Sequence, residues 1–542
     1  MNIVKKILVL IVFFLSFTSW AQEDAWVYFK AKANEQTYFD APTSMLSQRA
    51  LDRRKTQNIA LDFKDIPMNK VFVDQIKAVP NLVVMAQSKW LNALHIRGSI
   101  DAIKTLMNLP FVASIDFANK ALNDIHTKTK KIKYKQETTA TAGSVGFTYG
   151  ASDNQITMLK GNALHQQNYT GLGKIIAVLD GGFPGVNTIQ TFKRLRENNK
   201  ILGGYDFVNR ASDFYTGGSH GTYVLSSMGG YKENTLVGTA PDASYYLFIT
   251  EDNSYENPVE ESFWVEAAEK ADSLGVDIIT TSLGYFGDHT NPAYNHTYEE
   301  MSGDATFISK GANIAFSRGM IVVASAGNEG DTAEPHIGSP ADAFSVIAVG
   351  AVTSKKVRAS FSSIGPSYDG RIKPDVMAQG QSTVLSDEDG NVVTSSGTSF
   401  SGPIIAGMTA CLWQAYPNKT NQQIKNMILE AGDRYKAPTN QYGYGIPDFN
   451  LALTHGEALT TDASTNFFYI YPNPTSSAVT VAFPETFNKG KITFYSVYGQ
   501  KVLENYNIVP KEIISLKTLE NGAYFYKFEV DSFTQTGKII KN

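Results

Sequence analysis

Short runs of apolar residues alternate with amphipathic stretches through the middle of the chain. The runs that predict buried strands are 174–179, 244–249, 276–281, 320–325 and 344–349. Between two of them, apolar residues recur at helical spacing from Phe263 to Leu274, and Gly275 then predicts the end of that helix. Strands that alternate with helices predict a parallel sheet covered by helices on both faces, so the central fold class is α/β.

The stretch from residue 22 to about 140 has a different pattern. Apolar runs at 26–29 and 82–85 predict strands, and the segments 71–78 and 100–108 have helical spacing. Residues 128–146 are then rich in Lys, Thr, Ala and Gly, which is typical of an exposed linker that proteases can cut. The sequence therefore predicts a small α+β domain over 22–140, ahead of the central domain at 150–455.

The C-terminal part has a third pattern of apolar and polar residues. After the polar stretch 456–466, apolar and polar residues alternate in 491–497, 513–516 and 523–530. Turn residues separate these segments, at Gly499 and at Asn521-Gly522. This pattern predicts a small antiparallel β-sandwich over residues 467–542.

The first 21 residues have the features of a signal peptide. Lys5 and Lys6 precede an apolar stretch over 7–17, and the small residues Ser19 and Ala21 stand where a signal peptidase reads the chain. A membrane anchor is the alternative, but the stretch is shorter than the ~20 residues that cross a bilayer. We therefore expect export through a signal peptide at 1–21.

Composition narrows the classes of function. The 542 residues include 48 Lys and Arg against 52 Asp and Glu, a net charge of −4, so the chain lacks the basic excess of a nucleic-acid-binding protein. Hydrophobic residues make up 43%, which argues against extended disorder. The single cysteine, Cys411, cannot form an internal disulfide, so an exported form must be stabilised by packing or bound ions rather than by cross-links.

Four polar residues stand where the crevice of an open α/β sheet is expected, beyond the carboxyl ends of strands. Asp180 follows the first apolar run, His220 begins a helix-like stretch, and Asn328 follows the run at 320–325. Ser399 precedes a helix rich in small residues, with Pro403 expected in its first turn. Taken singly, each has an ordinary explanation as a turn, cap or loop residue.

Together these residues fill the roles of a nucleophilic hydrolase. A serine hydroxyl needs a base to take its proton, the base needs a carboxylate to hold it, and the oxyanion needs fixed donors. Ser399, His220 and Asp180 supply the first three groups. The Asn328 amide and the backbone N–H groups at the start of the Ser399 helix supply the donors.

At these motifs the chain resembles the subtilisin-like serine peptidases (subtilases), in which Asp, His and Ser occur in this order. The resemblance covers about 150–455 and implies a catalytic triad of Asp180, His220 and Ser399, with Asn328 in the oxyanion hole. It also implies a segment that pairs with the substrate backbone and a segment that lines the pocket for the residue before the scissile bond. These substrate-binding residues are Ser282, Leu283 and Gly284, and Ser325, Ala326 and Gly327, respectively. Such pairing indicates protein or peptide substrates.

The resemblance has departures and extensions. Gly181-Gly182 stands where Thr-Gly or Ser-Gly is usual, and Gln379 where Pro is usual. Residues 22–140 look like the inhibitory propeptide of subtilases, with an adhesion or folding module as the alternative. Residues 467–542 contain Tyr471-Pro472-Asn473-Pro474-Thr475, the Gly-Ala-Tyr of 522–524 and the ending at 538–541. In these features they resemble the C-terminal sorting domain of type IX secretion cargo, with a carbohydrate-binding or spacer sandwich as the alternative. We therefore expect a protein that is secreted or held at the cell surface.

Other sites and functions fit the sequence less well. Gly217 to Gly221 fits the G-x-S-x-G elbow of α/β-hydrolases, with Ser219 as nucleophile, but polar residues precede it where an elbow follows a buried strand. A non-catalytic scaffold would have no need of all four catalytic residues. His289, His296, Glu299 and Asp288 lie close in sequence but lack the HExxH spacing, so we expect solvated loop residues and no metal site.

Cofactors and specificity are less defined by the sequence. Subtilases often bind calcium for stability, yet 387–390 lacks the ligand ladder of an EF-hand and predicts a hairpin turn. No cofactor is required by the expected chemistry, and structural calcium has no assignable site. The sequence favours a secreted serine endopeptidase made as an autoinhibited precursor, and leaves its natural substrate, its residue preference, its cleavage sites and its oligomeric state open.

Overall fold

The computed structural model describes residues 22–123, 147–455, 469–471, 475–483, 489–510, 512–530 and 533–541. The predicted signal peptide, the predicted linker and the polar stretch 456–466 lie outside these ranges.

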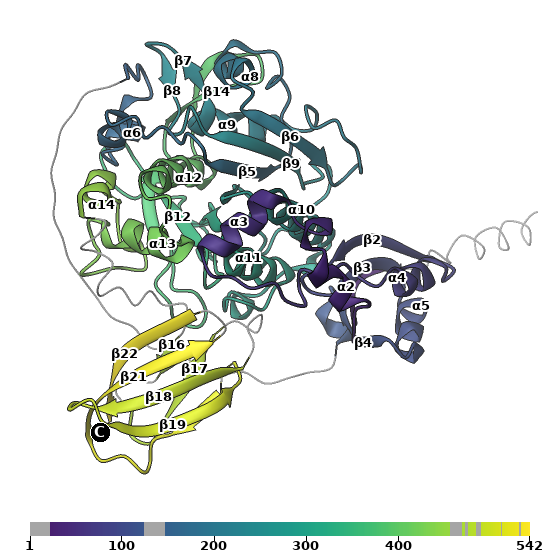
Figure 1. Ribbon diagram of the computed structural model, residues 1–542. Coiled ribbons are helices and arrows are strands. Elements are labelled where there is room, and N and C mark those ends of the chain that lie inside the picture. Colours follow the sequence, from purple (N-terminus) through teal and green to yellow (C-terminus); the bar gives the residue numbers. More distant parts are fainter. Residues whose placement is uncertain are drawn as a thin grey trace, which may run out of the picture.

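A seven-stranded parallel sheet forms the centre of the molecule (Figure 1). In spatial order its strands are β13 (Val376–Gln379), β12 (Ile347–Val352), β11 (Ile321–Ser325), β10 (Ile278–Thr281), β5 (Ile175–Asp180), β9 (Ser244–Ile249) and β6 (Ile201–Asp206). The predicted α/β class is confirmed. The run expected at 344–349 enters the sheet only at Ile347, because the backbone N–H and hydroxyl of Ser345 both bond the side chain of Asn313 instead of a strand.

Helices cover both faces of this sheet. On one face α9 (His220–Gly229) and α12 (Thr398–Ala415) pack in the larger hydrophobic core, and on the other α10 (Val259–Leu274) and α11 (Phe307–Ser317) pack in a second core. The predicted helix over 263–274 is the greater part of α10, and Gly275 ends it with φ +82°. The other α-helices of this domain are α6 (Asp153–Thr157), α7 (Asn162–His165), α8 (Lys193–Glu197), α13 (Asn421–Glu430) and α14 (Phe449–His455).

The strand order reverses beside β5, and this places the crevice. From β5 the chain builds β9 and β6 on one side, and β10 to β13 on the other. Ligands of open α/β sheets bind beyond the carboxyl ends of the strands at such a switch point. Asp180 is the last residue of β5 and Ser282 directly follows β10, so both lie at this edge. A separate hairpin of β14 (Thr383–Ser386) and β15 (Val392–Ser395) encloses the turn expected at 387–390.

The N-terminal domain is built on a four-stranded antiparallel sheet. Its strands, in spatial order, are β2 (Leu82–Ser88), β3 (Ala93–Ser99), β1 (Gln22–Phe29) and β4 (Val112–Phe117). Two helices, α4 (Lys70–Lys77) and α5 (Ile100–Thr105), pack on it, and a short helix α2 (Glu35–Asp40) follows β1. Apolar side chains from both layers, such as Val27, Ile76 and Ile103, form a core of its own. These elements match the predicted α+β pattern of this region.

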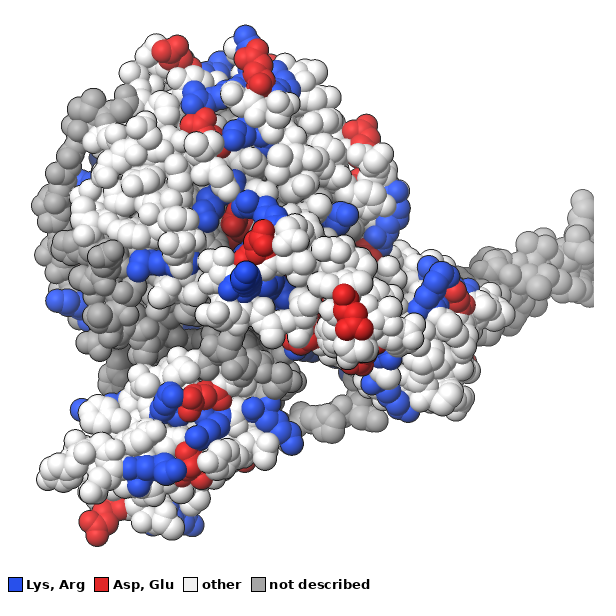
Figure 2. All heavy atoms as spheres, viewed as in Figure 1, with Lys and Arg blue, Asp and Glu red and all other residues white. Residues whose placement is uncertain are grey.

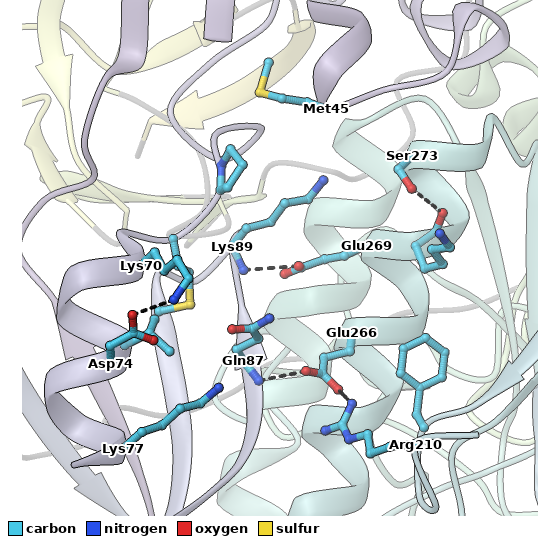
Figure 3. A pocket seen from close by; sticks show the side chains of 15 residues that line it. Met45, Lys70, Asp74, Lys77, Gln87, Lys89, Arg210, Glu266, Glu269 and Ser273 are labelled. Atoms are coloured by element: carbon cyan, nitrogen blue, oxygen red, sulfur yellow. Dashed lines mark hydrogen bonds and ion pairs between the residues drawn. The ribbon is translucent and has the colours of Figure 1, made fainter. Parts of the chain in front are cut away.

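This domain docks on α10 of the central domain. Ser88 Oγ and the Trp90 backbone N–H donate to Glu269 at 2.6 and 2.9 Å, and the Gln87 N–H donates to Glu266 at 2.9 Å. Beside these bonds a hollow of about 640 Å³ separates the two domains, with Lys70 and Lys77 on the N-terminal side (Figure 3). Carboxylates of α10 therefore accept hydrogen bonds from the end of β2 and from the residues that directly follow it.

One segment of the N-terminal domain leaves its own sheet. Helix α3 (Gln48–Thr56) lies among the helices of the central domain (Figure 1), where Arg54 bonds Asp272 of α10 and Asp65 of its own domain, each at 2.7 Å. The side chains of Arg54 and Asp272 are 2% and 0% exposed. Arg53 also pairs with Asp272. The sequence pattern did not predict this second attachment.

The C-terminal part forms two antiparallel sheets packed on each other. One sheet holds β16 (Tyr469–Tyr471), β17 (Ala478–Ala482) and β20 (Glu512–Ser515), and the other holds β19 (Lys501–Ile508), β18 (Gly490–Ser496), β21 (Gly522–Val530) and β22 (Phe533–Lys541). Phe483, Phe494 and Phe528 lie in the core between them. This is the β-sandwich that the alternating pattern predicted.

Charges of both signs are interspersed over the face shown in Figure 2. Among the described residues, no helix combines the length and the apolar character that crossing a membrane requires.

Candidate active site

Asp180 and His220 form a hydrogen-bonded pair in the crevice. His220, the first residue of α9, places Nδ1 2.8 Å from Oδ1 of the fully buried Asp180. The Gly181 N–H donates to the same oxygen at 2.8 Å, which fixes the carboxylate. The charge of Asp180 raises the pKa of His220 above its usual 6.5, although burial acts in the opposite direction. The pair can therefore hold an imidazole in one tautomer and stabilise its cation.

Ser399 is the second residue of α12, where backbone N–H groups lack partners within the helix. Pro403 lies one turn deeper in this helix than the sequence led us to expect, because α12 already begins at Thr398. A proline at this position cannot donate to the carbonyl of Ser399 four residues earlier. Ser282 Oγ fills the gap by donating to that carbonyl at 2.8 Å.

Asn328 is held beside Ser399 by Thr398. Its side-chain oxygen accepts from the Thr398 N–H at 2.9 Å and from the Thr398 hydroxyl at 3.1 Å. These bonds use the amide oxygen and leave the amide nitrogen available to a ligand. Gly327 precedes it with φ +107°, and a Cβ there would meet the Glu329 carboxylate at 2.4 Å, so the turn after β11 requires glycine.

Ser399 and His220 are neighbours, but no hydrogen bond joins them in the described residues. Ser399 Oγ donates instead to the Ser282 carbonyl at 3.4 Å, and the His220 ring lies 5.8 Å from the ring of Phe400. Catalytic hydrogen bonds are often long or misaligned before substrate binds. The absence of this bond before substrate binds therefore does not argue against a catalytic role for the two residues.

A cavity of about 670 Å³ collects most of the predicted site residues. Ser399 and Asn328 line it. All six residues expected to bind substrate line it as well, namely Ser282, Leu283, Gly284, Ser325, Ala326 and Gly327. Sequence reasoning missed a further wall, formed by residues 286–288 and 295–298. That loop carries no apolar periodicity, so nothing in its pattern tied it to the site.

The segment after β10 has a free backbone edge. Among the described residues, the N–H and carbonyl groups of Leu283 and Gly284 make no hydrogen bond, whereas the next residue, Tyr285, pairs with Ser339 in both directions at 2.8 and 3.1 Å. Free N–H and C=O groups in an extended segment can accept another strand. The cavity is thus bordered by a segment suited to pairing with an extended peptide.

The expectation that His289 and His296 are solvated loop residues is wrong. Their exposed fractions are 5% and 8%, because the loop that carries them folds back on α10, where His296 Nε2 lies 2.8 Å from Glu261. Glu299 is not part of this buried group. Ring nitrogens of both histidines and a Glu261 oxygen lie within 4.8 Å of one another.

One cluster of carboxylates among the described residues bears on the expectation of structural calcium. The carboxylates that approach one another are Glu251, Glu256 and Glu260, whereas calcium takes about six to eight oxygen ligands. Both Glu260 oxygens already accept backbone N–H groups at 2.7 Å, and Glu251 accepts the Tyr285 hydroxyl at 2.5 Å. This group is therefore poorly suited to calcium.

Comparison with known proteins gives the family. The profile of the subtilase family matches residues 171–445. Subtilisin NAT of Bacillus subtilis subsp. natto is 30% identical over 372 residues, which are 68% of this chain and 82% of that protein. The chain belongs to the subtilase family. Subtilisin DY of Bacillus licheniformis is 32% identical over 304 residues, 55% of this chain and 97% of that protein. A solved structure of the prenylagaramide maturation protease PagA matches with a TM-score of 0.42 and 21% identity, covering 56% of this chain and 99% of that one.

The flanking domains also have matches. The N-terminal domain matches the peptidase S8 propeptide domain of Bacteroidota over residues 24–137, and residues 469–542 match the secretion system C-terminal sorting domain. The predicted subtilase resemblance, the propeptide and the sorting domain are thereby confirmed, and the protein is a serine-type endopeptidase. The sorting domain supports secretion or attachment to the cell surface.

Proposed function

We propose that this subtilase cleaves peptide bonds through a triad of Asp180, His220 and Ser399 and an acyl-enzyme intermediate. His220 takes the Ser399 proton as the hydroxyl attacks the scissile carbonyl, and Asp180 stabilises the imidazolium. The observation that carries this proposal is the 2.8 Å bond between Asp180 and His220, at the edge of the sheet where α12 begins with Thr398 and Ser399.

The oxyanion is received by the Asn328 amide nitrogen and the Ser399 backbone N–H. The amide nitrogen is free because Thr398 engages the Asn328 oxygen. The positive end of the α12 dipole lies at the same place and favours the developing negative charge. An extended polypeptide then pairs with Leu283 and Gly284, with the residue before the scissile bond against Ser325 to Gly327.

The propeptide acts as an intramolecular inhibitor in this proposal. Its last described helical turn, Lys120–Leu122, contacts the loop whose residues Asn295 and His296 line the cavity, and Lys120 donates to the Asn295 carbonyl at 3.3 Å. The described part of the propeptide therefore reaches the loop that forms one wall of the cavity. The signal peptide directs export, and the sorting domain engages the secretion machinery that carries the protein across the outer membrane.

Hydrolysis of casein by the processed protein tests the triad. Ser399→Ala should lower turnover at least about 10⁴-fold, because the attacking hydroxyl is lost. Ser396→Ala, which removes a hydroxyl three residues away, is the matched control and should retain activity. Equal hydrolysis by wild type and Ser399→Ala would contradict the proposal. A fluorophosphonate should label Ser399, and a label on Ser219 would favour the hydrolase elbow instead.

Intact mass and N-terminal sequencing of the secreted protein test the precursor. Activity should appear as the mass of the propeptide is lost. Full activity of a chain that still carries residues 22–123 would refute inhibition by the propeptide.

A further inference from the structure

A buried group of two histidines and a glutamate lies outside the proposed triad. Glu261 comes from α10, and His289 and His296 come from the loop that follows β10. The three residues are 0%, 5% and 8% exposed. Their potential ligand atoms lie within 4.8 Å of one another, whereas a tetrahedral zinc ion with bonds of about 2.0–2.1 Å would hold its ligands roughly 3.4 Å apart. Small side-chain shifts would bring them to that spacing.

His289 has no partner for either ring nitrogen in the part of the chain that the structure describes. A buried polar group without a hydrogen bond costs about 1–3 kcal/mol. Its neighbours are the rings of Tyr285 and His296, with centroids at 6.4 and 5.6 Å. The buried His289 imidazole lies beside the His296 imidazole and the Glu261 carboxylate but bonds neither. A metal ion bound among the three side chains would supply the missing partner.

Hydrogen bonds hold the His289–His296 loop and the Glu261 carboxylate in place without a metal ion. The backbone N–H of His289 donates to the Asn295 side chain at 3.0 Å, and the backbone N–H of His296 donates to the Phe286 carbonyl at 2.7 Å. These two bonds hold the loop in a closed conformation. Glu261 Oε2 accepts the Ile308 N–H at 3.0 Å, which orients the carboxylate. Such outer bonds are typical of the residues that support metal ligands.

We propose that Glu261, His289 and His296 form a binding site for a divalent transition-metal ion, with zinc as the best fit. Two imidazoles and one carboxylate are a ligand set that suits zinc better than calcium or magnesium, which prefer oxygen. The site is separate from the triad and leaves a fourth position open. Because His296 also lines the cavity beside Ser399, a bound ion would stabilise one wall of that cavity.

The propeptide competes with the ion at His296. Lys120 Nζ lies 3.0 Å from Nδ1, and Glu261 occupies Nε2 at 2.8 Å, so both ring nitrogens are engaged while the propeptide is docked. A zinc ion at either nitrogen displaces one of these contacts, and the Lys120 ammonium adds a positive charge that opposes the ion. Glu300, 2.9 Å from Lys120, balances that charge only in part. The site therefore binds zinc more tightly once Lys120 is gone.

Zinc binding can be measured without any proteolysis. The full-length Ser399→Ala chain, freed of metal with a chelator, is dialysed against buffered Zn²⁺, and the bound metal is counted by mass spectrometry. We expect one zinc per chain, and an affinity at least tenfold lower in His289→Ala and His296→Ala. His336→Ala, a histidine outside this group, is the matched control and should bind as its parent does. Lys120→Met in the same chain should raise the affinity at least tenfold.

Each result tests either the zinc site itself or the competition between zinc and the propeptide. Absence of stoichiometric zinc in the parent and in Lys120→Met, or equal binding by His289→Ala, would overturn the site. An unchanged affinity in Lys120→Met would overturn the competition. If a histidine variant loses its native circular dichroism, Glu261→Gln decides, since it keeps the side-chain shape and removes the charge. Co²⁺ in place of zinc should give the visible absorption of a tetrahedral site.

Discussion

Ser282 donates its hydroxyl to the backbone carbonyl of Ser399 at 2.8 Å, and so completes the helix that presents the proposed nucleophile. Pro403 leaves this carbonyl without its usual partner in α12. One side chain next to the sheet thus joins the expected substrate-pairing segment to the start of the catalytic helix.

Loss of the Ser282–Ser399 hydrogen bond should destabilise the protein, and the size of the loss should depend on Pro403. Ser282→Ala leaves a buried carbonyl without a donor, so we expect a loss of about 1–3 kcal/mol in the free energy of unfolding. Pro403→Ala supplies a backbone N–H to the same carbonyl, and in that background Ser282→Ala should cost less. Urea unfolding of the four chains, all carrying Ser399→Ala to prevent self-cleavage, measures the coupling. Equal costs in both backgrounds would mean that Pro403 does not create the need for Ser282.

Loss of the Asn328 amide should slow turnover without abolishing it. Asn328→Leu removes one oxyanion donor, and loss of the oxyanion-hole asparagine in subtilisin costs about 10²–10³ in turnover. We expect a drop of that order in kcat, with a much smaller change in KM, because the oxyanion exists only after attack. Peptide hydrolysis under saturating substrate checks this. An unchanged kcat would remove Asn328 from the mechanism.

The pH profile should reflect the Asp180–His220 pair. Because Asp180 raises the pKa of His220 above 6.5 and the base must be neutral, kcat/KM should fall with acid through a midpoint above about 6.5. Asp180→Asn removes the negative charge, so its residual activity should have a midpoint at lower pH. Rates measured from about pH 5 to pH 9 test both statements, and a flat profile would contradict them.

The buried pairing of Arg54 should dominate the docking of α3. Arg54→Met leaves Asp272 and Asp65 buried without their main partner, so the precursor should lose about 3–5 kcal/mol. Lys70→Met is the matched control. Lys70 also pairs with an aspartate, Asp74, but the two side chains are 84% and 53% exposed, so about 0–0.5 kcal/mol is expected. Thermal unfolding of the Ser399→Ala precursor measures both. A similar loss in the two variants would show that the Arg54 network is not specific.

Much of the site was predictable because its residues follow strong apolar runs. Asp180, Ser282 and Asn328 each stand at or just after a strand, and parallel strands bring their carboxyl ends to one edge. The position of Pro403 was not predictable, since the start of a helix rich in small residues has no sharp apolar boundary.

The local pattern of apolar and polar residues does not reveal long-range electrostatic contacts. Arg54 and Asp272 are separated by 218 residues and meet only in the folded chain, and each alone has the pattern of an exposed helix residue. His289 and His296 were expected in solvent for a similar reason. Their loop lacks apolar periodicity, and the carboxylate that His296 bonds, Glu261, belongs to α10.

The propeptide holds α10 at two places, through β2 near Glu266 and Glu269 and through α3 at Asp272. It is therefore a bivalent ligand, in which each contact keeps the other at a high effective concentration. Two stretches of chain, 30–47 and 57–69, connect α3 to its own sheet. A first cut in either stretch leaves both contacts tethered through the other. Avidity ends only with the second cut, so degradation of the propeptide should free the enzyme abruptly rather than in proportion to the number of cuts.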